Sequence, residues 1–183
     1  MNDAVLADAV AALRAGAVIA YPTEAVWGLG CDPDNPAALE RLLALKARHP
    51  AKGMILIAGS IAQVDAWLEG LDDRLRERLL SSWPGPVTWL VPDNGRTHPL
   101  VKGQHDKVAL RVSDHPLVKA LTEAFGGPII STSANRSGNE PMRSAGAVRA
   151  EWQDDVVIVS GALGGRERPS VIRDLLTGDV LRA

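Results

Sequence analysis

Three cations stand at short spacing in one loop of this sequence. Lys46, Arg48 and Lys52 follow an apolar helical pattern and precede the apolar run of residues 54–58. Pro50 disfavours a helical conformation in the residue before it, so we expect an extended loop with Lys46 and Arg48 on the same side. Two neighbouring cations would accommodate a phosphate or a carboxylate between them. A loop whose charges contact only water is the alternative, and the loop alone favours that alternative.

Polar residues also stand next to several of the predicted strands. Arg111 lies inside the apolar run Val-Ala-Leu-Arg-Val, so its side chain either faces solvent or is buried against an anion. Residues 131–138 read as a loop of hydroxyl, amide and backbone N–H groups that can surround an anion, although their composition alone favours a plain turn. Ligands of open α/β sheets bind where loops converge at strand ends. Such a site would also receive residues 21–24, Ser170 and Arg182.

Signatures of the common nucleotide and hydrolase sites are absent from the sequence. The chain has no G-x-x-x-x-G-K-[ST] phosphate loop, no G-x-G-x-x-G motif and no G-x-S-x-G elbow. Its four histidines lack H-x-x-x-H spacing, so no dedicated metal site is expected. Cys31 is the only cysteine, which excludes an internal disulfide and a cysteine-based zinc site. Its small neighbours favour packing over a role as a nucleophile.

The composition is that of a globular protein. The chain has 183 residues, of which 46% are hydrophobic and 23% charged, and these values suit one domain over residues 1–183. The formal net charge of -2 argues against a surface that is basic throughout, but it allows one basic cleft. The N-terminus lacks the basic start of a secretory signal, and no apolar stretch is long enough to span a membrane. We therefore expect a cytoplasmic protein without membrane contact.

Hydrophobic periodicity and turn residues predict the elements that must position these groups. Helices are expected over residues 3–15, 35–46, 60–68, 72–80, 114–126 and 144–152. Strands are expected over residues 17–21, 54–58, 87–91, 108–112, 128–130, 156–159 and 170–173, with a hairpin turn at 177–179. The glycine-rich residues 24–30 and the polar residues 93–106 read as loops. The pattern predicts an α/β fold with one twisted, mixed sheet of parallel and antiparallel strands and flanking helices.

Five motifs occur together in order along the chain. They are Tyr-Pro-Thr-Glu-Ala-Val-Trp-Gly-Leu-Gly-Cys-Asp-Pro (21–33), Lys-Ala-Arg (46–48), Trp-Pro-Gly-Pro-Val-Thr (83–88), Ala-Leu-Arg-Val-Ser-Asp-His-Pro (109–116) and Ser-Thr-Ser-Ala-Asn-Arg-Ser-Gly (131–138). Over essentially its whole length the chain resembles the YrdC-like family, and within it the short bacterial form that makes threonylcarbamoyl-AMP. The resemblance implies a twisted mixed sheet with a large, positively lined concave face.

The resemblance also implies a reaction and its partners. L-threonine, bicarbonate and ATP would give threonylcarbamoyl-adenylate and pyrophosphate, with Mg²⁺ arriving on ATP. A separate threonylcarbamoyl-transferase complex would pass the group to adenosine 37 of tRNA, which makes the t6A modification. Weak tRNA binding by this chain is a further expectation. Every reactant is anionic, so a nucleotidyltransferase of this kind needs cations and no side-chain nucleophile.

The family's site residues fall on matching positions of this sequence. Lys46 and Arg48 match the catalytic cations, which also contact ATP. The contacts to threonine are implied at Thr23, Arg111, Ser131 and Ser170. The remaining contacts to ATP are implied at Lys52, Thr88, Ser133, Asn135 and Arg182. One position departs from the pattern, because longer relatives carry a histidine near threonine where this chain has Ile57. No general base for the amine is evident.

Three other functions are compatible with the sequence. An RNA-binding module would use the same basic cleft on tRNA or ribosomal RNA, although the net charge of -2 gives it little support and most tryptophans stand in apolar patterns. A carbamoyl-adenylate enzyme of the hydrogenase-maturation type shares the domain, but it normally carries a zinc finger, which a single cysteine excludes. A regulatory protein could bind the nucleotide without catalysis.

Overall fold

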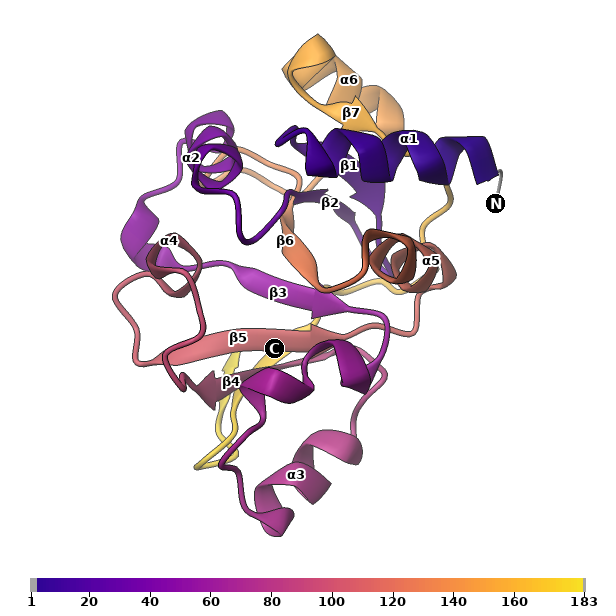
Figure 1. The fold of residues 1–183 in the computed structure, drawn as a ribbon. Coiled ribbons are helices and arrows are strands. Elements are labelled where there is room, and N and C mark those ends of the chain that lie inside the picture. Colours follow the sequence, from indigo (N-terminus) through magenta and orange to yellow (C-terminus); the bar gives the residue numbers. More distant parts are fainter. Residues whose placement is uncertain (1–2, 183) are drawn as a thin grey trace.

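The computed structural model describes residues 3–182, and within them all nine strands belong to one sheet. Their order across the sheet is β7-β1-β2-β6-β3-β5-β4-β8-β9. β7 with β1, β3 with β5 and β4 with β8 are parallel pairs, and the other neighbours are antiparallel. The strands are β1 (Ile19–Pro22), β2 (Trp27–Gly30), β3 (Ile55–Ala58), β4 (Val87–Pro92), β5 (Lys107–Val112), β6 (Ile129–Ser133), β7 (Val157–Ile158), β8 (Val171–Asp174) and β9 (Val180–Arg182). The expected mixed sheet is confirmed (Figure 1).

Six α-helices and four short 3-10 helices accompany the sheet in the described residues. The α-helices are α1 (Asp3–Arg14), α2 (Pro36–Leu45), α3 (Asp73–Leu80), α4 (Pro99–Lys102), α5 (Pro116–Phe125) and α6 (Ala145–Trp152). The 3-10 helices are Pro50–Lys52, Ile61–Gln63, Asp65–Trp67 and Gln153–Asp155. Asn35 starts α2 as expected, since its side-chain oxygen accepts from the N–H of Ala38 at 3.2 Å. None of the helices in residues 3–182 has the length and apolarity that a membrane crossing needs.

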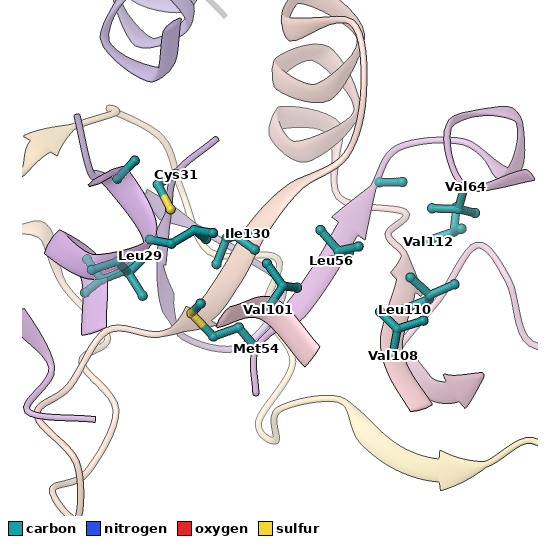
Figure 2. Packing of buried hydrophobic residues seen from close by; sticks show 14 of the residues in the cluster. Leu29, Cys31, Met54, Leu56, Val64, Val101, Val108, Leu110, Val112 and Ile130 are labelled. Atoms are coloured by element: carbon teal, nitrogen blue, oxygen red, sulfur yellow. The ribbon is translucent and has the colours of Figure 1, made fainter. Parts of the chain in front are cut away.

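Alternation of side chains along the strands divides the interior into two cores. In β3, Leu56 points into the larger core, where α2, α3 and α4 cover one face of the sheet. Figure 2 shows Leu56 with Leu110 and Ile130 among the side chains that fill this core. Ile57 belongs to the smaller core, which α1 and α5 cover from the opposite face. Ile55 lies on that second face but lines a cleft, so α1 and α5 leave part of the face open.

Three segments differ from the elements that the sequence predicts. Residues 27–30, expected as part of a glycine-rich loop, form β2, which pairs with β1 and β6. Gly30 permits this close pairing, because a Cβ atom there would stand 2.5 Å from the carbonyl oxygen of Ile130. Residues 60–68 contain two 3-10 helices rather than one longer helix, and residues 99–102 form α4 inside the expected polar loop.

The loop after α2 is a turn rather than an extended segment. Lys46 keeps helical dihedral angles (φ -87°, ψ -8°), and Ala47 is left-handed (φ 48°). His49 is extended (φ -66°, ψ 130°), because a proline restricts the residue before it. The prediction that Lys46 and Arg48 lie on one side of an extended loop is therefore wrong, and the turn sends the two side chains to different places.

The serine-rich segment begins inside the sheet. β6 continues through Ser133, which pairs with Gly28 of β2, and Ser131 pairs with Ile55 of β3. The expectation of a loop from residue 131 onward is wrong for its first three residues, because pairing on both sides overrides the turn preference of serine and threonine. Alternation along β6 then turns Ser131 and Ser133 toward the same face of the sheet.

The C-terminal hairpin forms as the sequence predicts. β8 and β9 pair antiparallel, with Ile172 opposite Arg182, and Gly178 in the connection is left-handed (φ 83°). β8 also pairs in parallel with β4, so the hairpin extends the sheet. The last described residue, Arg182, is thereby carried to the same face of the sheet as the cleft.

Candidate active site

A cleft of about 350 Å³ opens on the part of the sheet that α1 and α5 leave uncovered. Ile55 and Ala109 supply apolar surface from the central strands β3 and β5. The residues with expected site roles that line the cleft are Thr23, Arg48, Lys52, Arg111, Ser131, Ser133, Ser170 and Arg182. Lys46, Thr88 and Asn135 do not line it. Side chains from widely separated segments thus meet in one hollow, as the argument from strand ends expects.

Lys46 stands behind the wall of the cleft rather than in it. The residue is only 1% exposed, and its side chain runs from the end of α2 to the end of β6. Nζ donates to the backbone carbonyl of Ser133, to that of Asn135 at 2.7 Å, and to the Asn135 side-chain oxygen at 3.4 Å. Burial, and then the charge of Arg48, lowers the pKa of Lys46 to about 7. Lys46 therefore holds in place the backbone that carries Ser133, which lines the cleft.

The side chain of Asn135 is likewise committed to the protein. Its Nδ2 donates to the carbonyl of Arg136 at 2.9 Å and to that of Asn139 at 2.8 Å. Its Oδ1 accepts from Ser133 Oγ at 2.5 Å and from Lys46 Nζ. Since the donors and the acceptor of this amide are all in use, Asn135 orients Ser133, and it is Ser133 that faces the cleft.

Arg48 and Arg182 in the cleft have no carboxylate of the described residues beside them. Arg48 donates through Nε and Nη2 to the carbonyl of Gly53, at 3.1 and 2.8 Å, and Arg182 donates to the carbonyl of Ser170 at 2.8 Å. Within residues 3–182 neither arginine takes part in an ion pair. Burial lowers the pKa of both guanidinium groups. The charge of Arg182 lowers the pKa of Arg48 further, and the charge of Arg111 lowers that of Arg182 further. Cations that repel one another in this way form a site for an anion.

Arg111 is buried against an anion, which decides between the two alternatives that its sequence position left open. The anion is Glu24, whose Oε1 lies 2.7 Å from Arg111 Nη2, and Arg111 Nε donates to the carbonyl of Gly85 at 3.2 Å. Ser113 Oγ donates to the same Glu24 oxygen at 2.6 Å. The sequence assigned no separate role to Glu24. The available signal was an acid directly after a buried strand, in the segment Tyr-Pro-Thr-Glu.

The hydroxyl residues differ in their relation to the cleft. Thr88 is fully buried, and its Oγ1 lies 2.9 Å from the Oγ of Ser170, which does line the cleft. Thr23 lines the cleft while its Oγ1 donates to the carbonyl of Val26 at 2.8 Å. Thr88 therefore supports Ser170 from behind. Ile57 is completely buried in the smaller core, so it offers a ligand no contact at the position where longer relatives have histidine.

The cleft also contains basic residues that the sequence did not single out. They are Lys102, His105, Lys107, Arg166 and Arg168. Lys102 is paired with Asp93 at 2.7 Å, and Lys107 with Asp174 at 2.6 Å, so part of this charge is balanced. These residues stand in or next to loops where their spacing matches no motif, which is why sequence patterns did not reveal them.

Curated relatives resemble this chain over nearly its whole length. The Sua5/YciO/YrdC family model, which carries the description "Telomere recombination", matches residues 11–183. A threonylcarbamoyl-AMP synthase from Chromohalobacter salexigens is 64% identical over 177 residues, which cover 97% of this chain and 96% of the relative. A protein of the same name from Pseudomonas aeruginosa is 55% identical over 171 residues, which cover 93% of this chain and 92% of the relative.

Solved structures share the fold. The crystal structure of P. abyssi Sua5 complexed with L-threonine matches with a TM-score of 0.85 at 27% identity, over 96% of this chain and 52% of Sua5. This chain therefore spans about half the length of that protein. E. coli YciO has the same TM-score at 24% identity, over 99% of this chain and 89% of YciO. From the family model and the curated relatives together, the chain belongs to the Sua5/YciO/YrdC family.

Proposed function

We propose that this chain is a threonylcarbamoyl-AMP synthase, a nucleotidyltransferase that joins L-threonine, bicarbonate and ATP and releases pyrophosphate. The observation that carries the proposal is one cleft lined by Arg48, Arg182 and Arg111, in which the first two have no carboxylate partner within residues 3–182. All three reactants bring negative charge, so a cleft of this kind lowers the cost of bringing them together. Relatives at 64% and 55% identity bear the name of this enzyme, and the related Sua5 was crystallised with L-threonine.

The amino acid and the nucleotide would occupy neighbouring parts of the cleft. The threonine side is formed by Thr23, Arg111, Ser131 and Ser170. The phosphates of ATP lie against Arg48, Lys52, Ser133 and Arg182. The residues behind the lining, Lys46, Thr88 and Asn135, act by holding the two serines Ser133 and Ser170 in place. This arrangement revises the expectation that all three contact ATP directly.

The reaction needs two bond-forming steps. The neutral threonine amine attacks the carbon of CO₂ or bicarbonate to give a carbamate. With CO₂ the nitrogen loses a proton to solvent, and with bicarbonate that proton leaves together with the departing hydroxide as water. A carbamate oxygen then attacks the α-phosphorus of ATP, and the bond to the departing pyrophosphate breaks. Arg48 and Arg182 stabilise the charge that builds up on the phosphoryl oxygens, since planar guanidinium groups suit bidentate contacts with phosphate. No side-chain nucleophile takes part.

We propose that Mg²⁺ enters on ATP rather than through a protein site. Residues 3–182 contain no group of three or more His, Cys, Asp or Glu side chains that could hold a metal ion. The cleft offers mainly cationic and hydroxyl groups, which fit an ion that brings phosphate oxygens and water as its own ligands. Bound in this way, Mg²⁺ supplies further neutralisation of the phosphate charge.

The product would serve a second enzyme. We propose that residues 1–183 act as one YrdC-like domain in the cytoplasm, and that a separate transferase complex passes the threonylcarbamoyl group to adenosine 37 of tRNA. RNA binding by the cleft itself stays the alternative prediction, and the basic lining is the observation that favours it. The ion pairs of Lys102 and Lys107 reduce the charge that this lining offers to RNA phosphates.

Product analysis tests the proposal. The purified chain is incubated with ATP, L-threonine and ¹³C-bicarbonate, and the products are separated for mass spectrometry. We expect threonylcarbamoyl-AMP with the label in its carbamoyl carbon, and none when threonine is omitted. A complete mixture that yields no adduct, from a chain that instead forms a salt-sensitive complex with RNA, would favour the RNA-binding alternative.

A further inference from the structure

Among the residues of 3–182 that line the cleft, Glu24 is the only acidic one. Its side chain is 5% exposed, and its Oε1 is held by Ser113 Oγ at 2.6 Å and by Arg111 Nη2 at 2.7 Å. Its Oε2, in contrast, is buried and has no hydrogen-bond partner within residues 3–182. The protein therefore fixes one oxygen of this carboxylate and leaves the other without a donor.

An unpaired carboxylate oxygen is costly to bury, because a carboxylate can only accept hydrogen bonds. Buried polar atoms nearly always have a partner, so an exception at the wall of a cleft indicates a ligand that brings a donor. The torsion that turns the plane of a glutamate carboxylate is soft, so a small rotation presents Oε2 of Glu24 to the cleft. A cationic donor is favoured there, since Glu24 brings the single negative side chain of the lining.

We propose that Glu24 receives the α-ammonium group of the amino-acid substrate. The inference rests on the proposed function, because it takes threonine to be that substrate. An α-amino acid carries a carboxylate and an ammonium group on one carbon, and Arg111 and Glu24 offer the two opposite charges 2.7 Å apart. With the threonine carboxylate on Arg111, the ammonium group meets Oε2 of Glu24. The pair selects α-amino acids over carboxylates without an amine. It also positions the nitrogen, which attacks bicarbonate after the ammonium group has lost a proton to solvent.

Two other occupants fit Oε2 less well. A metal ion would need more anionic ligands, and residues 3–182 provide no group of His, Cys, Asp or Glu that could complete its coordination. A trapped water molecule would satisfy Oε2 of Glu24 without any function, and it would leave threonine binding independent of the Glu24 charge. The experiment below separates a water molecule from an ammonium group.

The test compares two ligands that differ only by the amine. L-threonine and 3-hydroxybutanoate, which is threonine without its amino group, are titrated by calorimetry into the native protein, Glu24→Gln and Glu123→Gln. Glu123 is exposed on α5, so its variant makes the same charge change away from the cleft. In Glu24→Gln we expect the Kd of threonine to rise about 10- to 100-fold and that of 3-hydroxybutanoate to stay within about twofold. In Glu123→Gln neither Kd changes by more than about twofold.

Every other pattern of Kd values contradicts the inference, and each pattern indicates a different role for Glu24. Equal weakening of both ligands in Glu24→Gln would mean that Glu24 only orients Arg111. Unchanged threonine binding would remove Glu24 from the substrate site and leave the proposed function intact. A native protein that neither binds threonine nor forms the adduct would overturn the proposed function together with the inference. If Glu24→Gln fails to fold, the two titrations of the native protein still test the inference. Equal Kd values for L-threonine and 3-hydroxybutanoate would contradict an ammonium site.

Discussion

Lys46 and Arg48 stand two residues apart in one loop, yet they lie on opposite sides of the cleft wall. Lys46 is buried, and oxygen atoms of Ser133 and Asn135 accept from its Nζ. Arg48 lines the cleft, where its guanidinium contacts carbonyl oxygens of its own loop and no carboxylate of the described residues. The left-handed Ala47 separates the two side chains. Neighbouring cations of one motif can therefore lie in different surroundings, one buried in the wall and the other lining the cleft.

Loss of Arg48 should have the largest effect on turnover. Arg48→Ala removes a guanidinium from the proposed phosphate site, so we expect pyrophosphate release to fall by at least about 100-fold. The unfolding temperature should shift by no more than about 2 °C, because the side chain is not part of either core. Arg149→Ala, an exposed arginine of α6, is the matched control and should keep full turnover. Normal turnover in Arg48→Ala would contradict the proposed role of Arg48 in binding the phosphates.

Loss of Lys46 should weaken the fold as well as the activity. Lys46→Met leaves buried carbonyls of Ser133 and Asn135 without their donor, so the free energy of unfolding should fall by about 1–3 kcal/mol. Turnover should fall too, because Ser133 is no longer held in place. Urea unfolding measures the first effect and pyrophosphate release the second. A variant as stable as the native protein would contradict the placement of Lys46 in the wall.

The pH dependence of the free energy of unfolding gives a second test of the burial of Lys46. In the folded protein burial lowers the pKa of Lys46 from 10.5 to about 7. Between these two values the unfolded chain binds more protons than the folded protein, so Lys46 makes the free energy of unfolding rise with pH, by up to about 1.4 kcal/mol per pH unit. The gap in unfolding free energy between the native protein and Lys46→Met should therefore widen from pH 7 to pH 9. A gap that stays constant would show that Lys46 titrates like a free lysine.

The smallest effect is expected at Cys31, which shares a motif with Thr23 but lies outside the cleft. Cys31 packs into the larger core, and burial raises the pKa of its thiol to about 12. Cys31→Ala should lower the free energy of unfolding by about 1 kcal/mol and leave turnover within about twofold. The native thiol should also react slowly with thiol reagents at pH 8. Rapid labelling of the folded protein, or a large loss of turnover, would place Cys31 in the site.

Much of the fold could be predicted because local signals and tertiary pairing agree. The apolar runs that became β3 and β5 are buried along most of their length, as their composition predicts. Asn35, a residue type that favours the N-cap position, caps α2. β2 was missed because its glycines resemble a loop, and only the pairing with β1 and β6 makes Gly28 and Gly30 part of a strand. A pairing between distant segments leaves no local pattern.

The motifs named residues that line the cleft, but they did not show how the side chains lie, and the roles of these residues stay predictions. The motifs marked Arg48, Arg111 and Ser133, which do line one cleft. They could not show that the side chains of Lys46 and Arg48 separate, since that depends on the positive φ of Ala47 between them. They also could not show that Glu24 pairs with Arg111, because the two residues are 87 positions apart and meet only through the fold.

The central claim is that one cleft brings threonine and ATP together, and pyrophosphate release tests it most directly. The rate is measured with the purified chain and Mg-ATP, first with L-threonine and bicarbonate and then with each omitted. The account predicts release that depends on both, and that falls to background in Arg48→Ala. Release at the same rate without threonine, or no release at all in the complete mixture, would contradict it.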